Sequence, residues 1–325
     1  MNARSAVLDD FRFHTGETLG QLGMGFVTLG HPGGEPVLLL HGTGGSASSF
    51  LTEAFGGVLF GPGQPLDLAR HFVVAPDSLG HGTSAKPSDG LLTGFPRYNY
   101  DDMVHAQYRL VTEVLGIRHF RLVMGNSMGG MHAWLWGVKY PGMMDALVPM
   151  ACQPTAMSGR NWILRRMLGE LIRNDADYRH GRYESQPRAA HLASLFFAFA
   201  TNGGDIALQA AAPTRAAADA LLDARLAALP DADANDLIHQ WEASGDFDAS
   251  VGLERITAHV LAINSADDER NPPETGRMAR AMERVKHGRC WLIPASTQTC
   301  GHGTTWHARW YAQPLAELLD SAPRQ

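Results

Sequence analysis

A short glycine-rich stretch, Gly125-Asn126-Ser127-Met128-Gly129-Gly130, contains the serine best placed for chemistry. The strand-like run 120–124 precedes it and a helix-like run follows, so Ser127 falls where a strand would turn sharply into a helix. Glycines two residues before and after the serine let such a turn close, and Gly130 lets the helix lie near the sheet. The pattern predicts a nucleophilic serine on this turn. The alternative is a glycine-rich turn without chemistry.

A serine hydroxyl is a poor nucleophile unless a base, usually a histidine, takes its proton and a carboxylate orients that base. On a strand–turn–helix nucleophile of this kind, the acid and then the histidine follow the serine in the chain. Asp267 and Asp268 follow the apolar run 259–264, and His302 lies between two glycines before the last helical stretch. Two adjacent carboxylates cannot both face one imidazole, and spacing alone favours Asp268 only slightly.

Two backbone N–H groups are needed to stabilise the negative charge that develops on a substrate oxygen. We expect one from Met128, at the start of a helix whose dipole also favours an anion. We expect the other from Thr43, in the glycine loop 41–45 that follows the apolar run 36–40. In this interpretation His41 hydrogen-bonds the loop and does not act as a second base. The alternative for this loop is an ordinary glycine loop.

Short apolar runs predict the strands that position these residues. Runs such as VLLL (37–40) and LVPM (147–150) do not alternate apolar and polar side chains, which is typical of strands buried on both faces of a mainly parallel sheet. The first two runs are close enough in the chain to form an antiparallel hairpin at one edge. The predicted strands are 11–14, 23–29, 36–41, 72–76, 120–124, 146–151, 259–264 and 290–294.

Helical patterns separate the later strands and predict a doubly wound α/β sheet. They lie at 102–116, 129–140, 274–286 and 304–320, and Pro314 is expected to kink or divide the last one.

Residues 153–247 break the alternation, because they contain no convincing strand and are rich in Ala, Arg, Leu and Met. They are interpreted as several helices inserted between two core strands. The predicted organisation is therefore an α/β core formed by 1–152 and 248–325, with a helical lid at 153–247. Such a lid would cover the carboxyl ends of the strands, where open α/β sheets place their sites. The apolar lid is also a candidate surface for a homodimer.

The composition of the chain argues against several classes of binding partner. A net charge of −6, a pI near 6.2 and the lack of a Lys/Arg block argue against nucleic acid. No phosphate-loop, dinucleotide or metal-ligand pattern occurs, so neither a cofactor nor a metal is expected. Three widely spaced cysteines indicate a reducing compartment, taken as the cytoplasm. No apolar run is long enough to span a bilayer.

Five motifs resemble, in order and spacing, those of the α/β-hydrolase superfamily: HGTGG (41–45), PDSLGHGTSAKPS (76–88), GNSMGG (125–130), NSADDERNPPE (264–274) and GHG (301–303). The resemblance covers nearly the whole chain and implies the α/β-hydrolase fold, a mostly parallel sheet with a helical lid insertion. The stretch from GNSMGG to YPGMMDALV, together with the pattern Asp268-x-x-x-Pro272-Pro273, is similar to the branch containing homoserine O-acetyltransferases and related hydrolases. This resemblance assigns the catalytic acid position to Asp268.

Two positions depart from the acetyltransferases of that branch. They usually carry an aspartate directly after the catalytic histidine, where this chain has Gly303, and PDSLGHGTSAKPS is the form common in simple hydrolases. The expected function is therefore hydrolysis of a small to medium carboxylic ester through an acyl-enzyme, with Ser127, His302 and Asp268 as the catalytic residues. The expected partner is a small acyl substrate. An O-acyltransferase with the same residues, or a non-catalytic ligand-binding protein on the same fold, are the alternatives.

Overall fold

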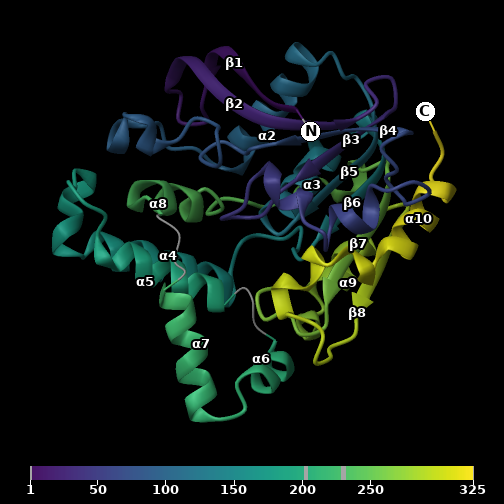
Figure 1. Ribbon diagram of the computed structural model, residues 1–325. Coiled ribbons are helices and arrows are strands. Elements are labelled where there is room, and N and C mark those ends of the chain that lie inside the picture. The colour runs from purple at the N-terminus through teal and green to yellow at the C-terminus, as the bar shows by residue number, and fades with distance from the viewer. Residues whose placement is uncertain (1, 201–203, 228–231, 325) are drawn as a thin grey trace.

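One sheet of eight strands runs through the computed structural model, which describes residues 2–200, 204–227 and 232–324 (Figure 1). In space the order is β1-β2-β4-β3-β5-β6-β7-β8, and only the pairings of β2 with β1 and β4 are antiparallel. This confirms the predicted α/β-hydrolase fold class with a mostly parallel sheet. The strands are β1 (Asn2–Arg12), β2 (Thr18–Gly30), β3 (Glu35–Leu40), β4 (His71–Pro76), β5 (Phe120–Asn126), β6 (Met144–Met150), β7 (His259–Ser265) and β8 (Gly288–Ile293).

The central strands are buried on both faces, as their unbroken apolar runs predict. Every residue of β5 and of β6 is buried. The register pairs Leu40 at the end of β3 with Gly125 of β5, and Asn126 with Met150 at the end of β6. The carboxyl ends of these parallel strands therefore meet at one edge of the sheet, which brings the loops that follow them together.

Helices cover both faces of the sheet. Buried side chains of α2, α3 and α9 share one apolar core with the sheet, and those of α1 and α10 share a second core on the other face. The bounds are α1 (Gly56–Leu59), α2 (Tyr100–Arg109), α3 (Met128–Lys139), α9 (Arg277–Met282) and α10 (Ala312–Ser321).

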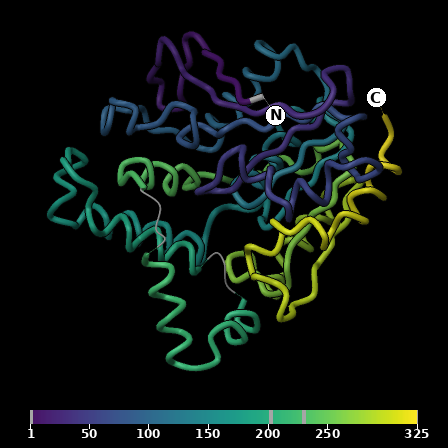
Figure 2. The backbone as a smooth tube through the Cα atoms, in the orientation of Figure 1, coloured from purple at the N-terminus to yellow at the C-terminus, as the bar shows by residue number. Residues whose placement is uncertain are grey.

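Between β6 and β7 the chain leaves the sheet, and we call residues 153–247 the insertion. Its described residues contain five α-helices, one 3₁₀ helix (Ala176–Gly181) and no strand. The α-helices are α4 (Gly159–Arg173), α5 (Arg188–Phe199), α6 (Asp205–Ala211), α7 (Arg215–Ala227) and α8 (Ala234–Glu242). Helices α4, α5 and α8 pack around a small core of their own that includes Leu168, Ala190 and Trp241. Figure 2 shows α6 and α7 extending away from the sheet, on the side opposite both termini.

Contacts with the loops at the carboxyl edge of the sheet hold the insertion in place. In α8, Asp236 accepts hydrogen bonds from the backbone N–H and the hydroxyl of Ser88, at 2.9 and 2.7 Å. Gln240 Nε2 of the same helix donates to the carbonyl of Gly80 at 2.8 Å. These contacts tie α8 to the loop that follows β4.

The predicted elements whose bounds differ most from the structure lie at the two ends of the chain. The first strand was expected at 11–14, but β1 spans Asn2–Arg12 and pairs with β2 as the expected edge hairpin. Most of its residues are exposed, so the apolar run that identifies a buried strand is missing. The last helix, expected at 304–320, is reduced to α10 after two short 3₁₀ turns. Pro314 lies in the first turn of α10, where its missing N–H costs no hydrogen bond.

Candidate active site

Ser127 occupies a strained turn between β5 and α3. Its φ of +55° and ψ of −113° lie where a residue with a side chain is seldom found. The surrounding backbone holds this conformation, because Ser127 N–H donates to the carbonyl of Met150 at 2.8 Å and Ser127 O accepts from Met131 N–H at 2.9 Å. The turn therefore has the geometry predicted for a displayed nucleophile.

Two glycines allow α3 to begin so close to the sheet. A Cβ on Gly129 would lie 1.9 Å from the carbonyl oxygen of Leu40, and one on Gly130 would lie 2.5 Å from that of Met150. Both neighbours are backbone atoms of central strands. They could make room only if a packed strand shifted, which would lower the stability of the fold.

We expect Gly129→Ala to lower the free energy of unfolding by about 3 kcal/mol, because the added methyl group overpacks α3 against β3. Gly142→Ala is the matched control, since a Cβ there meets nothing within 4 Å, and it should change stability by less than about 0.5 kcal/mol. Urea unfolding of both variants measures the difference. Equal midpoints would contradict the close contact.

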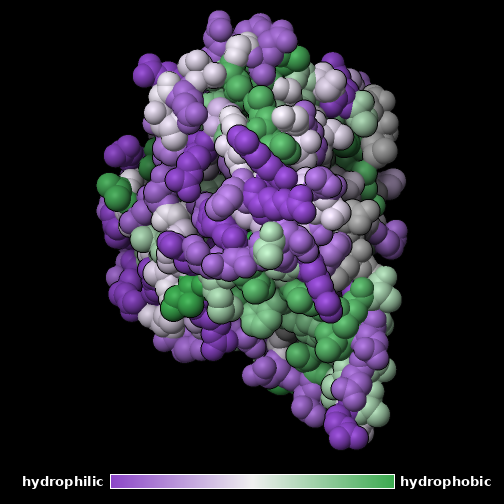
Figure 3. All heavy atoms as spheres, turned by 90° about the vertical axis from the view of Figure 1, so that its left-hand side faces the viewer, coloured by the Kyte–Doolittle hydropathy of each residue, from purple (hydrophilic) through white to green (hydrophobic). Residues whose placement is uncertain are grey.

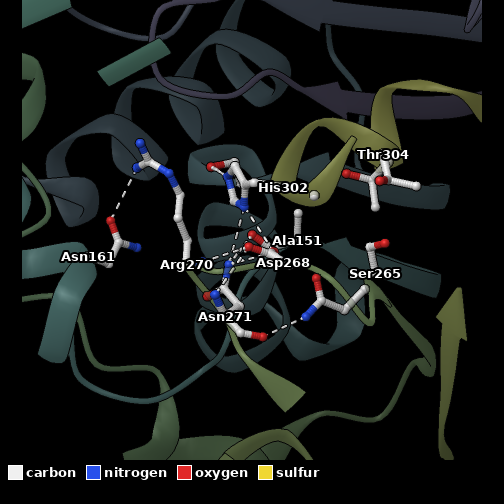
Figure 4. A network of polar contacts seen from close by, with 12 residues as sticks. Ala151, Asn161, Ser265, Asp268, Arg270, Asn271, His302 and Thr304 are labelled. Carbon is white, nitrogen blue, oxygen red and sulfur yellow. Dashed lines mark hydrogen bonds and ion pairs between the residues drawn. The ribbon is translucent and has the colours of Figure 1, made fainter. Parts of the chain in front are cut away.

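His302 connects the serine to a carboxylate. Its Nε2 lies 2.8 Å from Ser127 Oγ. Its Nδ1 lies 2.9 Å from Asp268 Oδ2 (Figure 4). Because Asp268 can only accept when ionised, Nδ1 carries the proton and Nε2 is left free to accept from the serine hydroxyl. The three predicted residues thus form one hydrogen-bonded chain, although they come from three separate loops.

Asp268 is held as an ionised acceptor. Its side chain is fully buried, and it accepts from the backbone N–H groups of Arg270 and Asn271 at 2.9 and 3.2 Å and from Asn271 Nδ2 at 3.1 Å. Burial alone would raise the pKa of Asp268, but His302 and these hydrogen bonds outweigh burial and leave the pKa below its ordinary value. A carboxylate in this state can stabilise an imidazolium on His302.

The adjacent Asp267 points elsewhere. It accepts from the hydroxyls of Ser265 and Thr299, the latter at 2.7 Å, and from Gly301 N–H at 3.2 Å. These contacts tie the loop after β7 to the loop that carries His302. Spacing alone left the choice between the two aspartates open. In the structure, Asp268 contacts His302, whereas Asp267 contacts the backbone and hydroxyl groups of the neighbouring loop.

The glycine loop 41–45 lies beside Ser127, since a Cβ on Gly42 would stand 3.4 Å from Ser127 Cβ. His41 Nδ1 donates to the carbonyl of Gly42, and its Nε2 accepts from Ser78 N–H, both at 2.9 Å. Burial lowers the pKa of His41. A neutral histidine with both ring nitrogens engaged matches the structural role expected for it. The expected oxyanion donors, Thr43 and Met128, follow directly after Gly42 and Ser127.

Asp77, to which the sequence interpretation gave no individual role, supports the glycine loop. It accepts from Ala47 N–H at 2.7 Å and from Thr83 N–H at 2.8 Å. The first bond fixes the chain just after loop 41–45. In the sequence, Asp77 was visible as the acidic residue of the PDSLGHGTSAKPS motif. The N–H groups that it accepts from could not be predicted from that motif. Asn271 was missed in the same way, although its Nδ2 bridges Asp268 and the carbonyl of Ala151.

A buried arginine, also missed, reaches the glycine loop from α4. Arg165 is 1% exposed, its Nε donates to Asn161 Oδ1 at 3.2 Å, and its Nη2 donates to Thr43 Oγ1 at 3.4 Å. Its Nη1 has no hydrogen-bond partner in the described part of the chain, and no carboxylate there forms an ion pair with it. A buried charge without a counter-charge is costly, so this guanidinium is suited to an anionic or oxygen-rich ligand group.

Arg270 connects the loop that carries Asp268 to the insertion. Its Nη2 and Nε donate to the carbonyls of Phe197 and Ala200 at the end of α5, both at 3.1 Å. Its guanidinium also lies 4.2 Å from the centre of the Phe197 ring. Burial, together with the charge of Arg165, lowers the pKa of Arg270 to about 9. The residue two positions after Asp268 thus positions α5 over the site.

Within the ranges 2–200, 204–227 and 232–324, no group of three or more His, Cys, Asp or Glu side chains is arranged to hold a metal ion. In the same ranges, no helix is both long and apolar enough to cross a membrane.

The chain belongs to the α/β-hydrolase fold family, because residues 35–296 match the family described as alpha/beta hydrolase fold. The predicted resemblance to this superfamily is therefore confirmed. Over 315 residues the chain is 29% identical to a probable acyltransferase of Methanothermobacter thermautotrophicus, in an alignment covering 91% of this chain and 90% of that protein.

Solved structures of an acyltransferase and of a hydrolase share the fold. A homoserine O-acetyltransferase from Bacillus anthracis superposes with a TM-score of 0.86 and 21% identity, covering 100% of this chain and 99% of that one. An acetylester hydrolase from Corynebacterium glutamicum superposes with a TM-score of 0.84 and 19% identity, covering 98% and 96%. At these identities the likeness establishes the architecture, and the reaction has to be argued from the site.

Proposed function

We propose that this protein is a serine hydrolase that cleaves a small to medium carboxylic ester through an acyl-enzyme. The observation that carries the proposal is the continuous hydrogen-bonded chain from Ser127 Oγ through His302 to Asp268. Its strained serine turn and its ionised, buried acid are features that a purely structural serine would not need.

In the first half of the reaction, Ser127 Oγ attacks the ester carbonyl carbon and its proton passes to His302 Nε2. Asp268 stabilises the imidazolium that forms. The N–H groups of Thr43 and Met128 receive the negative oxygen of the tetrahedral intermediate, and the N-terminal end of α3 adds a favourable dipole. The intermediate collapses as His302 returns the proton to the departing alcohol oxygen.

In the second half, water enters and His302 Nε2 takes one of its protons. The resulting hydroxide attacks the acyl carbon, and the ester bond to Ser127 Oγ breaks as the serine regains its proton. The insertion, residues 153–247, acts as a lid that limits the access of water and substrate to Ser127. We place the enzyme in the cytoplasm, in keeping with its three free cysteines.

A second candidate, O-acyl transfer, is favoured by Arg165. Its buried Nη1 has no described hydrogen-bond partner, and Nη2 contacts Thr43 in the glycine loop. A carboxylate on an acceptor alcohol would satisfy this guanidinium. The relatives include a probable acyltransferase, whereas Gly303 departs from the aspartate usual at this position in the acetyltransferases. Hydrolysis therefore stays the first proposal.

One experiment separates the two reactions. The purified enzyme is given a panel of acetyl to butyryl esters, with and without homoserine as acceptor, and both free acid and acylated acceptor are quantified. We expect free acid as the product and turnover independent of homoserine. Acylated homoserine that forms faster than free acid would overturn the proposal. In that case Arg165→Met should remove the stimulation by the acceptor, because the acceptor carboxylate loses its partner.

A further inference from the structure

The side-chain amide of Asn271 lies between the catalytic acid and the end of strand β6. Its Nδ2 donates to Asp268 Oδ2 at 3.1 Å and to the carbonyl oxygen of Ala151 at 2.9 Å. Figure 4 shows these residues together with His302. The reaction steps proposed for Ser127, His302 and Asp268 leave this amide without a task.

The neighbours of the amide fix its direction. Asp268 Oδ2 and the Ala151 carbonyl only accept hydrogen bonds, so the nitrogen of Asn271 has to face them. Both of its N–H groups are thus taken by oxygen atoms. His302 Nδ1 lies 3.4 Å from Asn271 Nδ2, but no amide hydrogen is left to bond it. Asn271 therefore does not favour the tautomer of His302 that has its proton on Nε2.

The amide completes a set of four hydrogen bonds to the carboxylate of Asp268. Oδ1 accepts from the backbone N–H groups of Arg270 and Asn271, and Oδ2 accepts from His302 Nδ1 and Asn271 Nδ2. With two donors on each oxygen, the carboxylate is held against rotation. Without the amide, Oδ2 would keep only His302 as its partner, and the two side chains could turn together away from the serine.

A strained end of the sheet anchors the amide. Ala151 follows the last residue of β6 and has a φ of +48°, a conformation that residues with a Cβ seldom take. Its N–H donates to the carbonyl of Ile263 in β7 at 2.9 Å, and the carbonyl before it, of Met150, accepts from Ser127 N–H. Consecutive carbonyls at the end of β6 thus hold the serine turn and, through Asn271, the acid.

The backbone of Asn271 is held separately from its side chain. Its carbonyl accepts from Asn264 Nδ2 at 2.8 Å, and Pro272 restricts the residue before it to extended conformations. Asn264 is therefore a matched control, because its bond ties the same loop through the backbone and not through the carboxylate of Asp268.

These bonds are shielded from bulk water. Asn271 is 6% exposed, and Asp268 and His302 are 1% and 5% exposed. Figure 3 shows the outer side of the molecule that carries the insertion, where hydrophilic residues spread over the middle and hydrophobic residues gather towards the projecting segment at the bottom. A hydrogen bond that Asn271 loses is therefore replaced only if the new side chain leaves room for a water molecule.

We propose that Asn271 is the positioning residue for the catalytic acid, because its amide holds Oδ2 of Asp268 against His302 Nδ1. This role rests on the proposed hydrolysis, to which it adds a residue. Two substitutions distinguish the role from simple packing. Leucine has nearly the shape of asparagine but no donor, whereas alanine leaves room for a water molecule that donates to Asp268 and Ala151.

Asn271→Leu should lower kcat about 100-fold and Asn271→Ala only about tenfold, with KM changed less than about twofold in both. A packing role predicts the opposite order, because alanine creates a cavity and leucine fills it. Asn264→Ala should stay within about threefold of the wild type, since Asp268 keeps all its donors. An alanine variant less active than the leucine variant, or an equal loss in Asn264→Ala, would overturn the proposal.

The pH dependence of kcat/KM gives a readout that packing would not move. Its acidic limb reports the group that must lose a proton before the serine attacks, here His302. Loss of the amide leaves more negative charge on Asp268 Oδ2, which stabilises the imidazolium, so the limb should shift to higher pH in Asn271→Leu. The other titratable groups beside Asp268 are Arg270 and Cys152, which the substitution leaves in place. An unshifted limb would contradict the role.

Labelling by a fluorophosphonate probe separates a failure of this proposal from a failure of the proposed hydrolysis. The probe reacts with Ser127 through the same His302 and Asp268 but needs no ester. If the wild type is labelled yet cleaves no ester, hydrolysis is wrong, and the labelling rates of the Asn271 variants still decide the role of the amide by their order. A wild type that is neither labelled nor active would overturn both proposals.

Circular dichroism and thermal unfolding check that the variants fold. If Asn271→Leu does not fold, the comparison of Asn271→Ala with Asn264→Ala decides. The first should be slower and have the shifted acidic limb, and equal rates and limbs would overturn the proposal.

Discussion

Ser127→Ala is expected to lower kcat for ester hydrolysis by about 10⁵- to 10⁶-fold. The hydroxyl oxygen forms the acyl-enzyme, so its removal eliminates the reaction path that His302 and Asp268 support. Alanine keeps a Cβ at the same φ of +55°, so the strain of the turn is unchanged and the fold should be retained. Steady-state kinetics on the best ester of the panel, with circular dichroism of both proteins, measures the effect.

A fluorophosphonate probe provides the independent readout. It should label the wild-type chain once, on Ser127, and leave the alanine variant unlabelled. Ser48→Ala is a suitable control, because the hydroxyl of Ser48 bonds that of Ser46 near the glycine loop and has no place in the proposed mechanism. Activity retained in Ser127→Ala would mean that Ser127 is not the nucleophile. It would favour the alternative hypothesis of a non-catalytic ligand-binding protein.

The second large effect is expected for Asp268→Asn, with a loss of about 10⁴ in kcat and little change in KM. The amide can donate to His302 Nδ1, which favours the tautomer that has its proton on Nε2. That nitrogen can then no longer accept the proton of Ser127. The substitution also removes the negative charge that stabilises the imidazolium.

Asp267→Asn is the matched control, because it makes the same chemical change one residue earlier. Its carboxylate bonds Thr299 and Gly301 in the loop of His302, so the variant should loosen that loop and lose at most about 100-fold in kcat. It should also unfold at lower temperature than the wild type. If Asp267→Asn loses more activity than Asp268→Asn, the proposed acid is wrong.

Much of the fold was predictable because it rests on local patterns. Strands buried on both faces leave unbroken apolar runs, and seven of the eight predicted runs overlap most of an observed strand. The exception is β1, an edge strand in which Arg4, Asp9 and Asp10 interrupt the apolar residues, so no such run forms. The turn at Ser127 was predictable for a related reason, since glycines must stand wherever a Cβ would strike backbone, as at Gly129.

The sequence by itself also determined the order of the serine, the acid and the histidine after their strands. Only the tertiary structure decided which atoms meet. Asp267 and Asp268 are adjacent and chemically identical, and their different partners follow from the path of the loop after β7. Arg165 in α4 and Asp268 in the loop after β7 are far apart in the chain, yet both contribute to the same site. Such contacts depend on how distant elements pack, which no local pattern records.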